Sequence, residues 1–241
     1  MDKALAAKLK NYKPGPLATK LVHDTPILLL VGPTGAGKDS IKDELLQTGR
    51  FHHIISHTTR PPRINHGIVE QDGREYHFID KVIAGQMLDD QSLIEAKMYS
   101  DNLYGTSVAE IKKAHDESKI AMTDIEVQGV AEYKALEPNV IAVFLLPPDF
   151  ETWQARLRRR YGDVVDAADY KLRLQTALQE LQEVLTTDYY VAVINDDLDK
   201  VVRQILTIVD SKNHTSPDEP AAREVAEKLS ESIKQYLSSN T

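Results

Sequence analysis

The stretch that most constrains this chain is residues 27–40, with the sequence ILLLVGPTGAGKDS. An apolar run ends at Gly32, four residues separate Gly32 from Gly37-Lys38, and a helical pattern follows. A strand, a glycine-rich turn and a helix N-terminus in this order are typical of a phosphate-binding P-loop. Average residue usage predicts Gly-x4-Gly-Lys by chance about 0.07 times in a chain of this length. The flanking patterns therefore favour a nucleotide-binding loop over a structural glycine turn.

Such a loop binds phosphate because successive backbone N–H groups at a helix N-terminus donate together, while glycines let the backbone come close. The lysine adds a mobile positive charge that can follow the transferred phosphoryl group. We expect nucleotide contacts from the whole loop, Gly32, Pro33, Thr34, Gly35, Ala36, Gly37, Lys38, Asp39 and Ser40. Asp124 ends a strand-like stretch at 119–125, where a magnesium-organising carboxylate usually lies beside a P-loop. A water-exposed strand end is the alternative.

Composition bounds the remaining possibilities. A chain of 241 residues can bury one core, with one or two small inserted lobes. Its 29 Lys+Arg against 37 Asp+Glu give a net charge of -8, which argues against nonspecific nucleic-acid binding. The absence of cysteine excludes disulfides, thiolate metal sites and cysteine nucleophiles. No stretch approaches a membrane span, and residues 1–21 lack the apolar centre of a signal peptide. We expect a cytoplasmic protein without nucleic-acid or membrane partners.

Strand-like and helical stretches alternate along the chain, which predicts an α/β fold with a parallel core sheet flanked by helices. The strand-like stretches are 27–31, 51–56, 73–78, 119–125, 139–146 and 189–194. Helical patterns include 108–119 and 198–209. Asn195-Asp196-Asp197 precede the second of these, and helix capping is an adequate structural explanation for those acids.

Both ends of the chain lie outside this alternation. Residues 1–24 are rich in Lys, Ala and Leu and are broken by prolines, so we expect a peripheral, solvent-exposed arm. Residues 211–220 resemble a linker. The last segment carries an apolar stripe at helical spacing, formed by Ala222, Val225, Ala226, Leu229, Ile233, Tyr236 and Leu237. This helix must bury its stripe on the body of the protein or on a partner, for example in a homodimer.

Two arginine-bearing segments are candidates for phosphate contacts. Arg60 and Arg63 lie three residues apart in SHTTRPPR, which the two prolines keep extended. They suit a second phosphate, although a surface turn with water-facing arginines fits equally well. Tyr76 could add a hydroxyl to the same anion or could simply pack. The second segment, RLRRR at 156–160, has four arginines, and its place after the fourth core strand favours a phosphate-closing lid over a solvated helix face.

Several stretches in this order resemble the guanylate kinase family, over about residues 25–210. They are GPTGAGK, SHTTRPPR, residues 73–78, IEAKMYSDNLYGTS, DIEVQGV, RLRRR and VINDDLDK. The resemblance implies a P-loop nucleoside monophosphate kinase fold, with a GMP-binding lobe inserted at 57–107 and a lid at 158–172. It leaves an extension at 1–24, and a linker with a helix at 211–241. It also implies ATP-dependent phosphorylation of GMP, with ATP and Mg2+ as cofactors.

The resemblance also assigns roles to individual residues. GMP would be bound by Ser56, Arg60, Arg63, Tyr76, Glu95, Tyr104, Thr106 and Glu126. The ATP phosphates would be handled by the catalytic residues Lys38, Arg156, Arg160 and Arg173, with Asn195 near the adenine. Asp39 and Asp124 are the expected metal ligands. A carboxylate such as Glu95 can accept from both the ring N–H and the amino group of guanine, whereas adenine would present a lone pair to it.

Three departures from the family pattern bear on these roles. The loop between Arg63 and Gly73 is longer than the family's, so Glu70 matches the family's acidic position only if the insertion precedes it. Glu126 stands where Asp is usual. Asp39 stands where a hydroxyl residue normally follows the lysine.

Two other functions compete with GMP phosphorylation. GKDS resembles ribose 1,5-bisphosphate phosphokinases, whose acceptor has no base, but Glu95 and the Tyr-Gly-Thr at 104–106 favour a guanine and phosphate site. A non-catalytic guanylate-kinase-like domain that binds phosphorylated peptides is the second alternative. The intact Lys38 and the arginine-rich segment argue against it.

Overall fold

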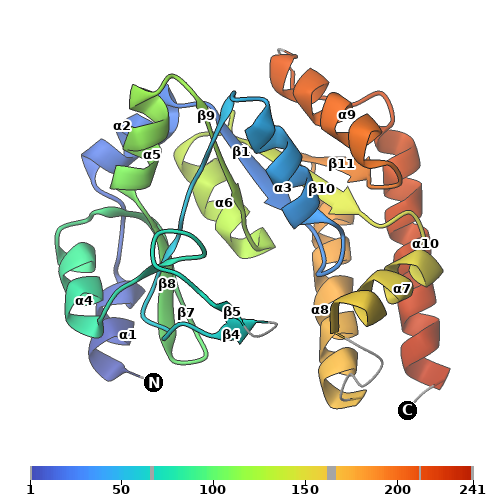
Figure 1. The fold of residues 1–241 in the computed structure, drawn as a ribbon, viewed down its shortest axis with the longest axis horizontal. Coiled ribbons are helices and arrows are strands. Elements are labelled where there is room, and N and C mark those ends of the chain that lie inside the picture. Colours follow the sequence, from blue (N-terminus) through green and yellow to red (C-terminus); the bar gives the residue numbers. More distant parts are fainter. Residues whose placement is uncertain (1, 66–67, 162–166, 212, 240–241) are drawn as a thin grey trace. The chain divides into compact units, whose positions relative to one another are not determined.

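The computed structural model describes residues 2–65, 68–161, 167–211 and 213–239 (Figure 1). Its contacts divide the chain into two compact units. The first comprises Met1–Ile27, Gly49–Thr123 and Ala131–Val140. The second comprises Leu28–Thr48, Asp124–Val130 and Ile141–Thr241. The expected GMP-binding lobe at 57–107 lies wholly in the first unit, and the P-loop lies in the second.

The second unit contains parallel strands, as the alternation predicts. Its strands are β1 (Ile27–Val31), β10 (Ile141–Leu146) and β11 (Tyr190–Ile194). The first residue of β1, Ile27, is assigned to the first unit. Leu30 pairs with Val143, Phe144 pairs with Ala192, and both ladders are parallel. Every residue of β1 and β10 is buried, as expected for strands covered on both faces.

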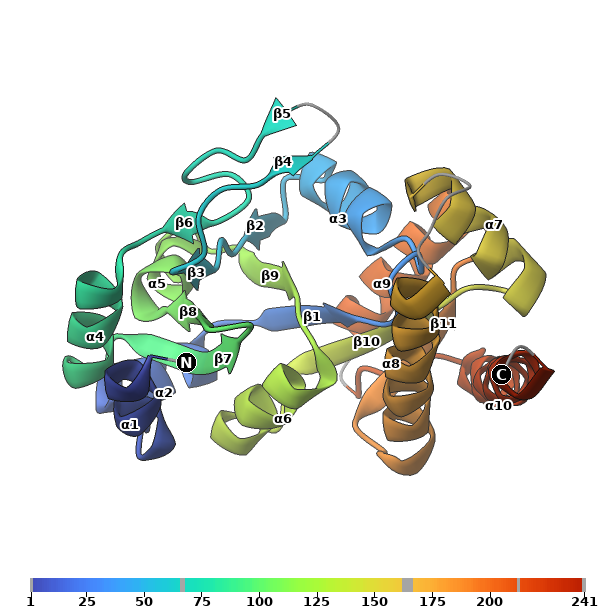
Figure 2. The ribbon, with the colours of Figure 1, turned by 90° about the horizontal axis from the view of Figure 1, so that it is seen from below.

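Helices flank these strands on both sides (Figure 2). They are α3 (Lys38–Gln47), α7 (Phe150–Tyr161), α8 (Ala167–Thr186), α9 (Leu198–Asp210) and α10 (Glu219–Ser239). α3 packs against α9, and α10 packs against α8 and β11. The capping prediction is confirmed, because the Asp197 carboxylate accepts a hydrogen bond from Lys200 N at 2.8 Å at the start of α9. The linker predicted at 211–220 spans the interval between α9 and α10, but α10 begins two residues earlier than expected, at Glu219.

Four residues of the apolar stripe of α10 are buried on the protein's own body, and Val225, Tyr236 and Leu237 are half-buried. Ala222, Ala226, Leu229 and Ile233 are all at most 2% exposed. On the polar side of the helix, Arg223 donates to Val184 O at 2.7 Å and so ties α10 to the end of α8. The sequence left open whether the stripe packs on the body of the protein or on a partner, and the structure shows it packed on the body.

The first unit holds further strands, from two to seven residues long. β2 (Phe51–His53) pairs in parallel with β9 (Ile120–Asp124). A separate sheet has the order β6-β3-β8-β7. Its members are β3 (His57–Thr58), β6 (His77–Phe78), β7 (Leu93–Tyr99) and β8 (Asn102–Ser107), and β4 (Ile64–Asn65) pairs with β5 (Ile68–Val69) in a small hairpin. The strands predicted at 51–56 and 73–78 are therefore shorter than expected.

Hydrogen bonds inside each unit continue the parallel pattern between β1 and β9. In the first unit, Ala121 N donates to Pro26 O at 2.9 Å. In the second, Ile125 N donates to Leu30 O at 3.0 Å. Backbone hydrogen bonds of the predicted parallel kind thus occur near the beginning and near the end of β1 and β9.

The helices of the first unit include two from the N-terminal extension. The two helices of the extension are α1 (Lys3–Lys10) and α2 (Pro16–Asp24). The others are α4 (Lys81–Asp89), α5 (Val108–Asp116) and the C-terminal part of α6 (Val127–Leu136). α1 packs on α4 and β7, and α2 packs on α5 and β7. Leu5, Ala18 and Val22 are at most 3% exposed. The prediction of a solvent-exposed arm is wrong, because these helices bury apolar residues that the Lys-rich composition obscured. No helix of the described residues is long and apolar enough to span a membrane.

Candidate functional site

The P-loop connects β1 to α3 through a turn in which Gly32, Gly35 and Gly37 take positive φ. Gly37 caps α3 in the left-handed region, with φ of 94°. A Cβ there would lie 2.2 Å from Asn195 Nδ2, so the position excludes larger residues. Asn195 Nδ2 donates to Ala36 O at 2.6 Å, and Trp153 Nε1 donates to Thr34 O at 2.7 Å. Two side chains from distant elements therefore hold the loop, and the sequence analysis missed Trp153.

Lys38 lies inside this loop and donates to the backbone carbonyls of Gly32 and Pro33. Burial lowers the pKa of Lys38, while the charges of Glu180 and Asp124 oppose that shift. Glu180, on α8, is a second residue that the sequence analysis missed, because a single Glu within a helix carries no signal. Burial raises the pKa of Glu180 to about 7, against the opposing charge of Lys38. The loop lysine thus interacts with a carboxyl group of α8 whose pKa is close to neutral pH.

The two expected metal ligands share one lysine. Lys42 Nζ lies 2.9 Å from Asp124 Oδ1 and 3.6 Å from Asp39 Oδ1. Burial alone would raise the pKa of Asp124, but the charges of Lys42 and Lys38 outweigh it and leave that pKa lowered. Both carboxylates are therefore within reach of a single cation. Among the described residues no group of three or more His, Cys, Asp or Glu could hold a metal.

This pair of carboxylates fits Mg2+. In nucleotide sites Mg2+ commonly takes one or two carboxylate ligands together with phosphate oxygens and water. Oxygen ligands from Asp39 and Asp124 meet that requirement without a third protein ligand. Lys42 was missed by the sequence analysis, because its neighbour Asp124 is 82 residues away along the chain.

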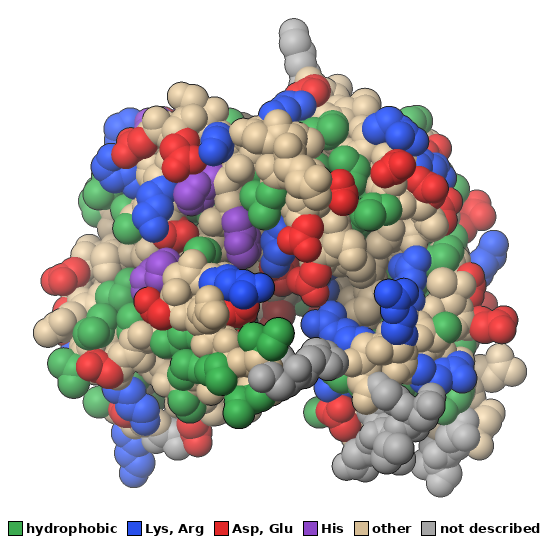
Figure 3. All heavy atoms as spheres, in the orientation of Figure 1, with side chains coloured by type: hydrophobic (Ala, Val, Ile, Leu, Met, Phe, Trp, Pro, Cys, Tyr) green, Lys and Arg blue, Asp and Glu red, His purple; other side chains and the backbone are tan. Residues whose placement is uncertain are grey.

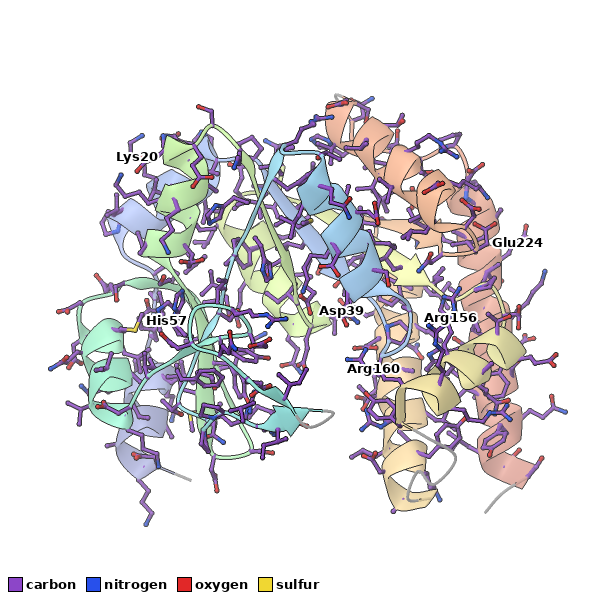
Figure 4. All side chains as sticks on the ribbon, in the orientation of Figure 1. Lys20, Asp39, His57, Arg156, Arg160 and Glu224 are labelled. Atoms are coloured by element: carbon purple, nitrogen blue, oxygen red, sulfur yellow. The ribbon has the colours of Figure 1, made fainter. Side chains whose placement is uncertain are left out.

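Two arginines of α7 lie close to the loop. Basic side chains gather over α7 in Figure 3, and Figure 4 labels Arg156 and Arg160 beside the start of α3. Arg156 Nη2 donates to Asn195 O at 2.9 Å, while its Nη1 is buried without a hydrogen-bond partner among the described residues. Arg160 Nη1 lies 3.5 Å from Asp39 Oδ2. Arg156 thus presents a buried donor next to residues that hold the P-loop.

The third expected arginine, Arg173, makes different contacts. Its Nε donates to Asp169 Oδ2 at 2.9 Å and its Nη1 to the Tyr161 hydroxyl at 3.1 Å. Its guanidinium also lies 4.1 Å from the centre of the Tyr161 ring. The predicted lid at 158–172 is helical up to Tyr161 and again from Ala167, and residues 162–166 lie outside the described part of the chain.

In the first unit, a cluster forms around Arg60, which is 6% exposed. Its Nη1 and Nη2 donate to both carboxylate oxygens of Glu70 at 2.8 and 3.1 Å, and its Nε donates to the Tyr104 hydroxyl at 3.1 Å. The Tyr76 ring centre lies 5.2 Å from its Cζ. Glu70 Oε2 also accepts from Arg63 N at 2.8 Å. The water-facing alternative is wrong for Arg60, whereas Arg63 is exposed as that alternative expects.

Glu95 lies on β7 opposite Thr106 of β8 and is 9% exposed. Burial raises the pKa of Glu95 to about 7, although hydrogen bonds from Thr106 oppose the shift. The two strands approach closely here, because a Cβ on Gly105 would lie 2.6 Å from Glu95 O. The Tyr-Gly-Thr motif therefore positions Thr106 against a buried carboxylate.

The remaining two predicted GMP ligands belong to different units. Ser56 directly precedes β3, and its carbonyl accepts from His77 N at 2.9 Å. Glu126 is exposed and lies in the second unit, where its carbonyl accepts from Gly129 N at 2.9 Å at the start of α6. Within the first unit, Ser56 thus lies next to the first residue of β3, in the sheet that carries Glu95, Tyr104 and Thr106.

A family model described as guanylate kinase matches residues 24–212. The chain belongs to the guanylate kinase family. The guanylate kinase of Latilactobacillus sakei subsp. sakei is 32% identical over 193 residues, which cover 79% of this chain and 91% of that protein. The guanylate kinase of Schizosaccharomyces pombe is 30% identical over 210 residues, or 86% of this chain and 96% of that one.

A solved structure is also similar. The crystal structure of guanylate kinase from Anaplasma phagocytophilum superposes with a TM-score of 0.58 and 22% identity, covering 85% of this chain and 96% of that one. At that identity the likeness concerns the fold alone. It confirms the predicted α/β fold, and the family match confirms the resemblance drawn from the motifs. The extension at 1–23 lies outside the matched residues.

Proposed function

We propose that this chain transfers the γ-phosphoryl group of ATP to GMP, giving ADP and GDP. The observation that carries the proposal is the buried Glu95 carboxylate, paired with Thr106 in the unit that also holds the Arg60 cluster. A guanine base and a monophosphate need this combination of a carboxylate and a guanidinium with hydroxyls. Membership of the guanylate kinase family supports the same substrates.

In the acceptor site, Glu95 would accept hydrogen bonds from the ring N–H and the amino group of guanine, with Thr106, Ser56 and Glu126 completing the base contacts. Arg60 would donate to the GMP phosphate through the second N–H of Nη2, since its other N–H groups already bond to Glu70, Pro61 O and the Tyr104 hydroxyl and hold the guanidinium in place. Arg63, Tyr76 and Tyr104 would add donors to that phosphate. The attacking phosphate oxygen is anionic, so this site needs no general base.

In the donor site, the P-loop backbone and Lys38 would bind the ATP phosphates, and Asn195 would lie near the adenine. Arg156 would donate from its buried Nη1 to the transferring phosphoryl group, and Arg160 and Arg173 would stabilise charge there. Asp39 and Asp124 would hold Mg2+, which neutralises phosphate charge when bound. Catalysis then consists of holding two nucleotides in line and stabilising charge on the phosphoryl group.

The other parts of the proposal concern partners and location. We propose a cytoplasmic enzyme of purine nucleotide metabolism without nucleic-acid or membrane partners. A homodimer stays an untested prediction, and Ala222, Ala226, Leu229 and Ile233 of α10 are buried without a second copy. The ribose 1,5-bisphosphate and phosphopeptide alternatives find no support in the relatives' names.

A coupled assay of ADP release with a panel of acceptors tests the proposed reaction. We expect turnover with GMP and little turnover with AMP, because adenine would place a lone pair against Glu95. Ribose 1,5-bisphosphate should be inactive, since it offers no base. Turnover with ribose 1,5-bisphosphate but not with GMP would replace the proposed acceptor. Binding of nucleotide without any ADP release would favour a non-catalytic module.

Asp39 is expected to affect the magnesium requirement. Asp39→Ala should lower kcat and raise the Mg2+ concentration needed for half-maximal turnover several-fold, because a charged oxygen ligand is lost. Asp39→Ser should retain activity or improve it, since a hydroxyl supplies a neutral ligand with less repulsion towards ATP. Titration of Mg2+ against turnover at saturating nucleotide measures both effects. Superimposable titrations for all three proteins would mean that Asp39 only stabilises its helix.

Lys42→Met provides a matched control for this titration. Lys42 pairs with both carboxylates, so its ammonium competes with a metal for them. Its removal should lower the Mg2+ requirement, opposite to the effect of Asp39→Ala. A shift in the same direction for both variants would indicate general damage to the loop rather than loss of a ligand.

A further inference from the structure

The N-terminal extension contacts the strand that carries Glu95. The Tyr12 hydroxyl, just after α1, donates to Leu93 O at 2.6 Å and accepts from Leu93 N at 3.0 Å. β7 is the last strand in the order β6-β3-β8-β7, and edge strands present backbone groups without a strand partner. The Tyr12 hydroxyl therefore forms both hydrogen bonds that a residue of a neighbouring strand would form with the backbone of Leu93.

The backbone at this point is irregular. Leu93 pairs with Ser107 while Glu95 pairs with Thr106, so two steps along β7 match one step along β8. This is a β-bulge at Ile94, and a bulge changes which face the following side chains take. Leu93 and Ala96 accordingly belong to the same apolar cluster, although an unbroken strand would place Leu93 and Glu95 on one face. The bulge turns Glu95 out of that cluster.

The extension also covers the apolar face behind Glu95. Leu5 of α1 is a buried member of the cluster that contains Leu93 and Ala96, and Leu9 and Tyr12 pack against it. Figure 2 shows α1 and α2 beside β7 within this unit. Burial is the main cause that raises the pKa of Tyr12, and the charge of Glu95 adds to it, so the hydroxyl stays a donor at neutral pH. These residues precede the part of the chain that the family model matches.

We infer that Tyr12 is a positioning residue for GMP, which fixes the bulge at Leu93–Ile94 and thereby aims the Glu95 carboxylate at the base. The inference rests on the proposed role of Glu95. The extension would then help to hold the acceptor site in place. Its loss would weaken binding of the GMP base and leave binding of the ATP phosphates unchanged. Tyr12 itself contacts no substrate.

Tyr12→Phe in the full-length protein tests this inference, because it keeps the ring and removes only the hydroxyl. We expect KM and the calorimetric Kd for GMP to rise by about five-fold, while KM for ATP stays within about two-fold, since two backbone groups beside Glu95 lose their partner. The Leu93 amide should also exchange faster. Lys8→Met is the matched control, because Lys8 bonds to Asp89 and Gly85 on α4 but not to β7. It should lower Tm without changing GMP binding.

A double variant separates this inference from the proposed site. If Tyr12 acts through Glu95, Tyr12→Phe should have no further effect on GMP binding in the Glu95→Gln background. Equal losses in both backgrounds, or a fall in Tm with unchanged GMP binding, would overturn the inference alone. If Glu95→Gln by itself leaves GMP binding unchanged, the proposed base site is wrong and the role of Tyr12 is rejected with it.

Discussion

Glu95→Gln is expected to lower kcat/KM for GMP by roughly 10²-fold, because an amide in that place cannot accept both guanine donors. Glu95 is only 9% exposed, so water replaces the lost acceptor poorly. KM for ATP should stay unchanged, since the P-loop and its arginines belong to the second unit. Steady-state kinetics with each nucleotide varied in turn measure the two effects separately.

Glu132→Gln is a suitable control for this variant. Glu132 is a neighbouring acid with a 43% exposed side chain, which lies 3.6 Å from Lys97 Nζ. Its replacement removes a nearby charge but no proposed base contact, so GMP kinetics should change little. Equal losses in the two variants would show that local charge, not acceptance of guanine, explains the effect.

The same carboxylate makes GMP use depend on pH. Burial raises the pKa of Glu95 to about 7, and the protonated form cannot accept both hydrogen bonds. KM for GMP should therefore rise as pH falls below that value, by up to about tenfold per pH unit. A phosphate monoester also titrates near pH 6, so Glu95→Gln is the control that keeps the phosphate transition and loses the carboxylate one.

Stability should change in the opposite direction to activity. Because the folded-state pKa of Glu95 is raised from 4.5 to about 7, the folded protein loses stability as pH rises through that window. Glu95→Gln removes this cost and should stabilise the protein above pH 7, by up to about 3 kcal/mol. The gain should vanish near pH 4, where both proteins are neutral at this position. Denaturant unfolding without nucleotide at both pH values measures it, and a destabilised variant at high pH would contradict the assigned pKa.

Deletion of residues 211–241 is expected to lower Tm by roughly 10 °C, because α10 is a large part of the second unit's packing. Leu229 and Ile233 are at most 2% exposed, and each buried side chain of this size contributes about 1.5–3 kcal/mol before ordering entropy is subtracted. Arg223 also loses its bond to Val184 O. All matched motifs precede Ser211, so the folded truncated enzyme should keep its kcat at low temperature.

Two full-length variants define the cause of this loss. Leu229→Ala with Ile233→Ala should reproduce much of the Tm decrease, while Glu227→Ala, on the exposed face of the same helix, should not. Thermal unfolding and size-exclusion chromatography of all three proteins measure stability and oligomer size. An unchanged Tm on truncation would show that α10 does not stabilise the body, and a changed oligomer size would indicate that it joins two copies.

Local features of this protein could be predicted from its sequence. The P-loop depends on glycines that adopt positive φ between a buried strand and a helix, and Gly32, Gly35 and Gly37 all do so. The parallel strands were predicted because apolar runs alternate with helical patterns. The motifs around Arg60 and Glu95 identified the family, because each is a short contiguous stretch that can be compared directly with the family's sequence. Boundaries were less accurate, and β2 and β6 are shorter than their patterns suggested.

Only the tertiary structure decided which distant side chains meet. Glu70 pairs with Arg60, Lys42 joins Asp124 to Asp39, and Tyr12 bonds to Leu93 across 81 residues of sequence. The extension looked solvated because its lysines dominate its composition, while a few apolar residues were enough to dock it. A hydrogen bond or ion pair of this kind depends on where two elements pack, and a raised pKa such as that of Glu95 depends on how deeply they bury it. Neither quantity is a property of a short stretch of sequence.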